Sequence, residues 1–179
     1  MVDPATSRRW FYRGLFLLTC VIVIFLQMLP LGTIPNRLPA PDALFAITAA
    51  WVMRRPRQTP VLLICVVFFV ADMLFLRPPG VWTAAVVLGT EVLRRQVSTR
   101  QDVTIILEMA FFAGVFAAMV AMNTLVLLMF GVDAPDVLTS ALHVVITVAF
   151  YPLSIGLCRF GLGVRRPRPG EIDVDEAIA

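Results

Sequence analysis

Four ionisable side chains lie inside long apolar stretches of the sequence, where a charge is costly and therefore marks a candidate site. They are Asp72, Glu91, Glu108 and His143. Glu91 precedes Arg94 and Arg95 by three and four residues, a spacing that predicts a surface ion pair on one helix. Glu108 is within reach of Arg100 or of an arginine in a neighbouring loop, so structural pairing is the favoured interpretation.

Asp72 differs because no basic residue accompanies it within its own apolar segment. Only Arg77, in the turn that follows, is placed to fold back onto it. At a rise of about 1.5 Å per residue, Asp72, Asn123 and His143 all lie roughly 6–10 Å below the same surface. These three residues form a candidate polar cluster, and interhelical hydrogen bonding is favoured over catalysis.

The sequence contains none of the motifs that identify common catalytic or metal sites. There is no G-x-S-x-G, no P-loop, no paired-aspartate signature of intramembrane enzymes and only one histidine. Cys20, Cys65 and Cys158 lie in apolar segments without metal-ligand spacing and are interpreted as core residues. We therefore predict that the protein is not an enzyme and uses no cofactor or metal.

Six apolar segments must position these residues. The chain is 59% hydrophobic and 15% charged, too apolar for 179 residues to bury in a water-soluble core. We predict an all-α integral membrane protein with six transmembrane helices. Twelve residues rise about 18 Å against about 30 Å of hydrocarbon, so the short second and fourth segments are either sheltered by longer helices or re-entrant. The expected segments are Gly14–Leu31, Asp42–Met53, Val61–Leu76, Val81–Leu93, Val103–Phe130 and Val137–Leu157.

The basic residues predict the orientation of these segments. Thirteen of the fifteen arginines flank the segments on one side, and only Arg37 and Arg77 lie on the other. Positive charge stays on the cytoplasmic side, so both termini are expected in the cytoplasm. The net charge of +3 is then explained by topology and by anionic membrane lipids, with no nucleic-acid partner. The two basic cytoplasmic loops hold Arg54, Arg55, Arg57, Arg94, Arg95 and Arg100.

Two parts are expected along the chain. Residues 1–164 form the six-span membrane domain, and residues 165–179 form a mobile cytoplasmic tail with too little apolar content to fold alone. Within the membrane domain, Asp42 is expected to cap the second helix and Thr59 the third.

The fifth segment carries small residues at four-residue spacing. Ala110, Gly114 and Ala118 would share one helix face, and such faces let two helix backbones approach closely. Either a helix of the same chain or a helix of another membrane protein would occupy this candidate docking face. The residues alone leave both possibilities open.

The order of these features resembles the MreD family of bacterial rod shape-determining proteins. The similarity covers nearly the whole chain apart from the last fifteen residues. The similar elements are Arg8-Arg9-Trp10, Gln27-Met28-Leu29-Pro30, Pro41-Asp42-Ala43-Leu44, Trp51, Asp72, Gly80-Val81 and Tyr151-Pro152.

This resemblance implies a non-enzymatic scaffold of the cell-elongation machinery, or elongasome, in the bacterial inner membrane. The implied partners are MreC, the actin-like MreB, and through them RodA and its penicillin-binding transpeptidase, so that cell shape is linked to peptidoglycan synthesis. The resemblance also implies an architecture similar to the substrate-binding subunits of energy-coupling-factor (ECF) transporters. No catalytic residue is implied.

A transport protein is the alternative. A small-molecule-binding subunit would use the region of Asp72, Asn123 and His143 as an outward-facing pocket. Such a pocket needs more convergent polar residues than the outer halves of these segments contain.

Overall fold

The computed structural model describes residues 4–29, 39–99, 104–133 and 135–161. A 3₁₀ turn, η1 (Pro56–Gln58), joins the second helix to the third, and a π-helical turn, η2 (Leu157–Gly161), continues the sixth. No strand occurs in these ranges, which confirms the prediction of an all-α chain. The helices are α1 (Pro4–Met28), α2 (Ala43–Arg54), α3 (Val61–Leu74), α4 (Val81–Thr99), α5 (Ile105–Met129) and α6 (Val137–Gly156).

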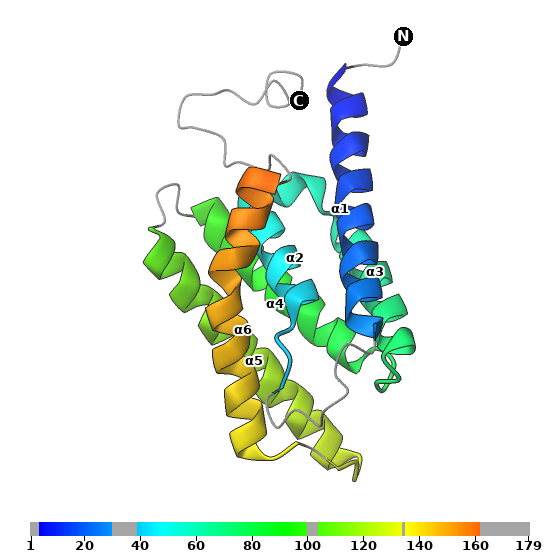
Figure 1. Cartoon of the computed structure of the whole chain (residues 1–179), viewed down its shortest axis with the longest axis vertical. Helices are drawn as coiled ribbons and strands as arrows, with labels where there is room; N and C mark the ends of the chain where they lie inside the picture. The colour runs from blue at the N-terminus through cyan, green and yellow to red at the C-terminus, as the bar shows by residue number, and fades with distance from the viewer. Residues whose placement is uncertain (1–3, 30–38, 100–103, 134, 162–179) are drawn as a thin grey trace.

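Successive helices run in alternating directions, so the connections gather at opposite ends of the bundle. In Figure 1, the start of α1, the turn η1 and the end of α6 all lie toward the upper end of the bundle. The α3–α4 and α5–α6 connections lie toward the lower end. This order is compatible with the alternation of basic and non-basic connections along the sequence.

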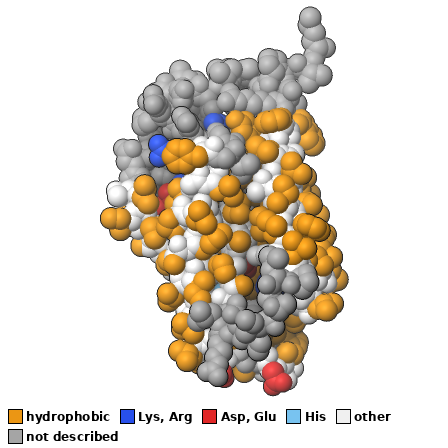
Figure 2. Space-filling model, viewed as in Figure 1, with side chains coloured by type: hydrophobic (Ala, Val, Ile, Leu, Met, Phe, Trp, Pro, Cys, Tyr) orange, Lys and Arg blue, Asp and Glu red, His pale blue; other side chains and the backbone are white. Residues whose placement is uncertain are grey.

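Three helical segments are long and apolar enough to cross a membrane. They are Trp10–Met28, Ile105–Met129 and Val137–Phe160. The helices α2 and α3 are also apolar but have only 12 and 14 residues. Figure 2 shows hydrophobic side chains over most of the visible face, with the described basic side chains only near its upper end. These features indicate a membrane protein.

The centre of the bundle is α2, which contacts α1, α4 and α6. Eleven of its twelve residues are buried. Trp51 is fully buried and meets Phe16 of α1 edge to face, with 5.4 Å between ring centroids. Phe45 stacks on Phe112 and Phe116 of α5 at 5.6 and 5.5 Å. A helix that is apolar on all sides is stable in this position because other helices surround it.

The predicted cap of α2 is confirmed, and that of α3 is wrong. Asp42 Oδ1 accepts a hydrogen bond from the Phe45 N–H at 2.9 Å, which satisfies one of the free donors of the first turn. In α3 the N-cap residue is Pro60, with no side-chain capping bond. The Thr59 hydroxyl is buried without a hydrogen-bond partner in the described part of the chain.

The end of α4 also differs from the prediction. The helix continues to Thr99 instead of ending near Leu93. Arg94 and Arg95 are therefore helical residues and not part of a loop. The prediction placed the end of the helix where the apolar residues end, at Leu93. The helix itself continues beyond this point with polar residues.

The close approach of α4 to α5 depends on Gly89. A Cβ atom at this position would lie 2.5 Å from Sδ of Met119 and 3.1 Å from Cγ1 of Val115, both on α5. A Cβ atom at this position would require the Met119 side chain to move and the Val115 side chain to give slightly, so glycine allows these side chains of α5 to pack directly on α4. Gly114, the glycine predicted to give such an approach, has nothing within 4 Å of its Cβ position.

We expect Gly89→Val to destabilise the protein by about 1–3 kcal/mol, the usual cost of overpacking. Gly114→Val is the matched control, because it adds the same β-branched side chain to a helix where space is open. Thermal unfolding in mild detergent should give a lower Tm for Gly89→Val than for Gly114→Val. Equal Tm values would show that α4 and α5 do not pack closely at Gly89.

Candidate functional site

A buried ion pair joins α2 to α5 near the η1 end of the bundle. The Arg54 guanidinium lies 3.2 Å from Glu108 Oε1, and the two side chains are only 8% and 2% exposed. The Tyr151 hydroxyl of α6 donates to the same oxygen at 2.7 Å. Arg54 also donates to the backbone carbonyl of Ala50 at 2.9 Å. Three helices therefore converge on one carboxylate.

The surroundings of this network are apolar and aromatic. The Tyr151 ring stacks on Phe112 at 4.0 Å between centroids, and its hydroxyl lies 3.5 Å from the Met53 sulfur. A charge pair in such surroundings loses hydration and is retained only when its geometry and hydrogen bonds are good. The prediction that Glu108 is paired structurally with an arginine is confirmed, but Arg54, expected in a loop, is the last residue of α2. This network joins α2, α5 and α6.

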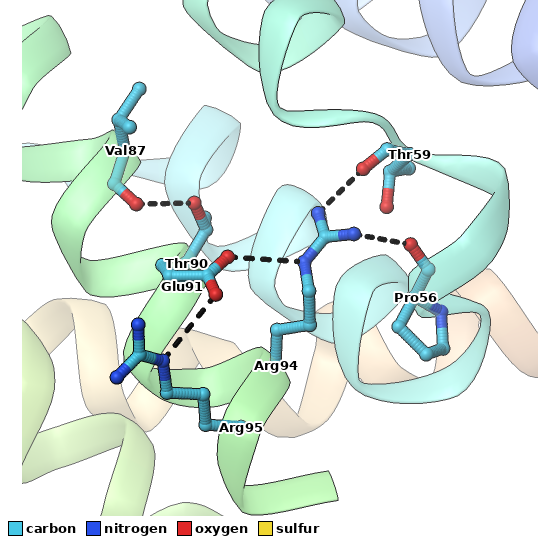
Figure 3. A network of polar contacts seen from close by, with 7 residues as sticks. All are labelled: Pro56, Thr59, Val87, Thr90, Glu91, Arg94 and Arg95. Atoms are coloured by element: carbon cyan, nitrogen blue, oxygen red, sulfur yellow. Dashed lines mark hydrogen bonds and ion pairs between the residues drawn. The ribbon is translucent and has the colours of Figure 1, made fainter. Parts of the chain in front are cut away.

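Arg94 fastens the α2–α3 connection to α4 (Figure 3). Its two terminal nitrogens donate to the backbone carbonyls of Pro56 at 2.7 Å and Thr59 at 2.6 Å. Its Nε lies 3.6 Å from Glu91 Oε2, and Arg95 Nε lies 3.4 Å from Glu91 Oε1. The predicted pairing of Glu91 with both arginines is confirmed. We name the Arg94 contacts with Pro56 and Thr59 the loop clamp.

The predicted basic surface is thus smaller than its six arginines suggest. Arg54 is buried in the ion pair and Arg94 is used in the loop clamp, so neither side chain is presented to a partner. Arg55 lies over the Tyr12 ring at 5.6 Å, and the Arg95 side chain is 81% exposed. The Arg57 side chain, Arg100 and the tail 165–179 lie outside the described residues.

At the opposite end, Asp72 of α3 binds the N-terminus of α4. Its Oδ2 accepts hydrogen bonds from the N–H groups of Gly80 and Thr83, both at 3.1 Å, and from the Thr83 hydroxyl at 2.7 Å. Gly80 has a φ of 86°, a left-handed conformation that favours glycine. A carboxylate at a helix N-terminus is stabilised by the free N–H groups and the helix dipole. Asp72 is therefore held in place by α4.

The other two members of the predicted polar cluster have different surroundings. The His143 ring of α6 meets Phe116 edge to face at 5.4 Å. Asn123 is partly exposed on α5. No hydrogen bond joins Asp72, Asn123 and His143 to one another within the described part of the structure. Asp72 binds the next helix along the chain instead, because the free donors at the start of α4 are closest to it.

A small cavity lies beside Asp72. Its volume is about 10 Å³, which is space for roughly one water molecule. Polar residues from four elements reach it. They are Gln27 of α1, Asp42 before α2, Asp72 of α3 and Arg77 of the α3–α4 connection.

The predicted docking face of α5 lies on the outside of the chain. Ala110, Gly114 and Ala118 are all exposed. The inner side of α5 instead carries Phe112, Phe116 and other buried residues that face α2, α4 and α6. Of the two occupants left open by the sequence, a helix of the same chain does not cover this face within the described residues.

Some residues of these networks were not predicted. Thr83 was missed, although a carboxylate one element earlier is a natural partner for a helix start. Tyr151 was noted for its sequence context but not as a partner of Glu108. Nothing in a sequence indicates which tyrosine on α6 faces a carboxylate on α5, because that depends on the rotation of both helices.

Removal of Glu108 should be strongly destabilising. Glu108→Ala leaves the Arg54 charge buried without its carboxylate, which typically costs about 3–5 kcal/mol. Glu91→Ala is the matched control, since an exposed ion pair contributes about 1 kcal/mol or less. Chemical denaturation in detergent measures both. The double variant Arg54→Met/Glu108→Leu should regain most of the loss, and failure to do so would contradict a purely structural role.

Loss of the loop clamp should loosen the α2–α3 connection. Arg94→Ala removes two charge-assisted hydrogen bonds, each worth about 1.5–3 kcal/mol in favourable cases. Amide hydrogen exchange of the non-proline residues in 55–60 should become faster, while exchange in α5 stays unchanged. Arg95→Ala, which removes an exposed neighbour of the same charge, should leave exchange in 55–60 as it is. Equal effects of the two substitutions would show that general charge, and not the clamp, orders the connection.

Two features remain outside the contacts that hold the bundle together. They are the exposed small-residue face of α5 and the cavity beside Asp72. Both are candidates for contact with another molecule. Comparison of the chain with protein-family models, with characterised proteins and with solved structures finds no match.

Proposed function

We propose that this chain is a six-span, non-enzymatic scaffold of the rod-shape machinery in a bacterial inner membrane, as its resemblance to the MreD family implies. The observation that carries the proposal is the exposed small-residue face of α5. Ala110, Gly114 and Ala118 form a helix surface suited to close contact with another helix, and the described helices of this chain leave it uncovered.

The six-span arrangement is supported by helix direction and by charge. The six helices alternate in direction (Figure 1), and thirteen of the fifteen arginines flank the apolar segments on one side. The short helix α2 lies inside the bundle, so it needs no lipid-facing length of its own. In this proposal both termini are cytoplasmic.

The scaffold role is supported by the contacts of the buried carboxylates, which are made with other groups of the protein. Glu108 is bound by Arg54 and Tyr151, and Asp72 by the start of α4. These carboxylates stabilise the fold and are not presented together to a substrate. A protein of this kind acts through the surfaces of its helices, its short connections and its tail.

The proposed partners follow from the resemblance and from the two kinds of surface. The single membrane span of MreC would dock on the small-residue face of α5. The basic end of the bundle would meet anionic lipid headgroups and MreB. RodA and its penicillin-binding transpeptidase would be connected through these partners.

The cavity beside Asp72 does not favour the transport alternative. A pocket for a drug-sized or vitamin-sized molecule encloses about 300–1,000 Å³. The cavity beside Asp72 encloses about 10 Å³. We therefore keep the scaffold as the single proposed function.

Gly114→Leu tests the proposal. A leucine at this position blocks close approach of a partner helix, but it has open space within the chain and a higher helix propensity than glycine. We expect the amount of MreC recovered with the tagged protein from native membranes to fall about tenfold, which corresponds to about 1.4 kcal/mol. Quantitative mass spectrometry of the purified complex measures this change.

Gly14→Leu is the matched control, since it places the same side chain at an exposed position of α1 where space is also open. It should leave MreC recovery unchanged. Unchanged recovery with Gly114→Leu would exclude the α5 face as the docking site. Absence of every wall-synthesis protein from the unsubstituted complex would contradict the scaffold itself.

A further inference from the structure

Two arginine–aromatic pairs lie where apolar segments reach the η1 end of the bundle. The Arg13 guanidinium of α1 lies 5.3 Å from the centroid of the Trp10 ring, and the Arg159 guanidinium of η2 lies 5.4 Å from that of Phe160. Trp10 is the first residue and Phe160 the last residue of two segments that are long and apolar enough to cross a membrane. Since α1 begins and α6 ends at the same end (Figure 1), both pairs mark the same edge of the apolar surface.

The aromatic rings of these pairs face outward. Trp10 is 65% exposed and Phe160 is 79% exposed. Both α1 and α6 pack against α2, which lies between them in Figure 1, so the two pairs lie on different sides of the bundle. Exposed aromatic side chains at the ends of membrane-spanning segments lie at the level of the lipid headgroups. An arginine over such a ring holds its charge at that level, while its apolar stem lies against the ring.

The described part of the chain supplies no anion to either arginine. Its ion pairs are made by Arg54, Arg94 and Arg95. The Nε atom of Arg13 has no hydrogen-bond partner there, and the Arg159 side chain is exposed. Both guanidinium groups can therefore receive an anion from outside the chain.

The charge at this end of the bundle favours an anionic lipid over a neutral one. The charged side chains described there are six arginines and only two glutamates. They are Arg13, Arg54, Arg55, Arg94, Arg95 and Arg159, with Glu91 and Glu108. A guanidinium group can bind a phosphate with two parallel hydrogen bonds. A zwitterionic lipid brings its own cation to such a site, whereas an anionic phospholipid brings only negative charge.

We propose that Arg13 and Arg159 each bind the phosphate of an anionic phospholipid in the surrounding leaflet, with the rings of Trp10 and Phe160 against the upper part of its acyl chains. Arg95 is exposed as well, but it pairs with Glu91 and takes no part in these sites. The lipid sites rest on the membrane location in the proposed function and name the lipid contacts of its basic end. They are independent of the docking face on α5.

Quenching of tryptophan fluorescence by brominated lipid tests the site on α1. Trp51 and Trp82 are buried, so the difference between the unsubstituted protein and Trp10→Phe isolates the signal of Trp10. The full-length protein is placed in phosphatidylcholine bilayers that contain the same mole fraction of brominated phosphatidylglycerol or brominated phosphatidylcholine. We expect the anionic lipid to be preferred at Trp10 by about fivefold, which is roughly the contribution of one arginine near a membrane surface. No preference would overturn the proposal and leave Arg13 to a protein partner.

Substitutions assign the preference to one side chain. Arg13→Gln should remove most of the preference at Trp10. Arg95→Gln is the matched control, because it removes the same charge from the same end of the bundle, and it should leave the preference unchanged. A Tm equal to that of the unsubstituted protein verifies folding of both variants. Equal losses in the two variants would show that the general surface potential attracts the lipid, and would overturn the site at Arg13.

The site on η2 is tested by moving the reporter. Phe160→Trp in the Trp10→Phe background places a tryptophan beside Arg159. The same preference for brominated phosphatidylglycerol is expected there, and Arg159→Gln should remove it; quenching that does not respond to Arg159→Gln would overturn this second site. Recovery of MreC is a separate measurement. Loss of the lipid preference with unchanged recovery of MreC would support the lipid sites and leave the proposed scaffold function intact.

Discussion

Because α2 is surrounded by other helices along nearly its whole length, water cannot satisfy the polar groups at its two ends. The cap residue of α2 and side chains of neighbouring helices do so instead. At the start, Asp42 caps the first turn and its own N–H donates to the Thr147 hydroxyl of α6 at 3.1 Å. At the end, Arg54 is neutralised by Glu108 of α5. The burial of one short helix thereby determines which residues of α5 and α6 must face inward.

The two ends of the bundle satisfy the buried polar groups with different kinds of side chain. Near η1 the polar contacts are made by arginines, which neutralise a carboxylate and bind backbone carbonyls. Near the α3–α4 connection they are made by carboxylates, which bind helix N-termini. Between these ends the core is aromatic, with Phe45, Phe112 and Phe116 in mutual contact. The outer surface is left to apolar side chains and to the small residues of α5.

Hydrophobic segmentation and local capping chemistry made much of this fold predictable. The apolar segments correspond to helices, Asp42 is a cap, and Glu91 pairs with Arg94 and Arg95 because such contacts depend on neighbours within a few residues. Contacts between elements that are distant in the sequence were harder to predict. The pairing of Glu108 with some arginine was predicted. The hydrogen bond from Tyr151 to Glu108 was not, because the rotation of each helix decides which side chains meet. The small-residue pattern similarly does not reveal that Gly89, and not Gly114, lies between packed helices.

The loop clamp and Asp72 together determine how α3 and α4 are joined. Arg94, in the second half of α4, binds the carbonyls of Pro56 and Thr59 just before α3 begins. Asp72, near the end of α3, binds the N–H groups of Gly80 and Thr83 at the start of α4. The two helices therefore form a hairpin that is closed by polar contacts at its open end as well as at its turn.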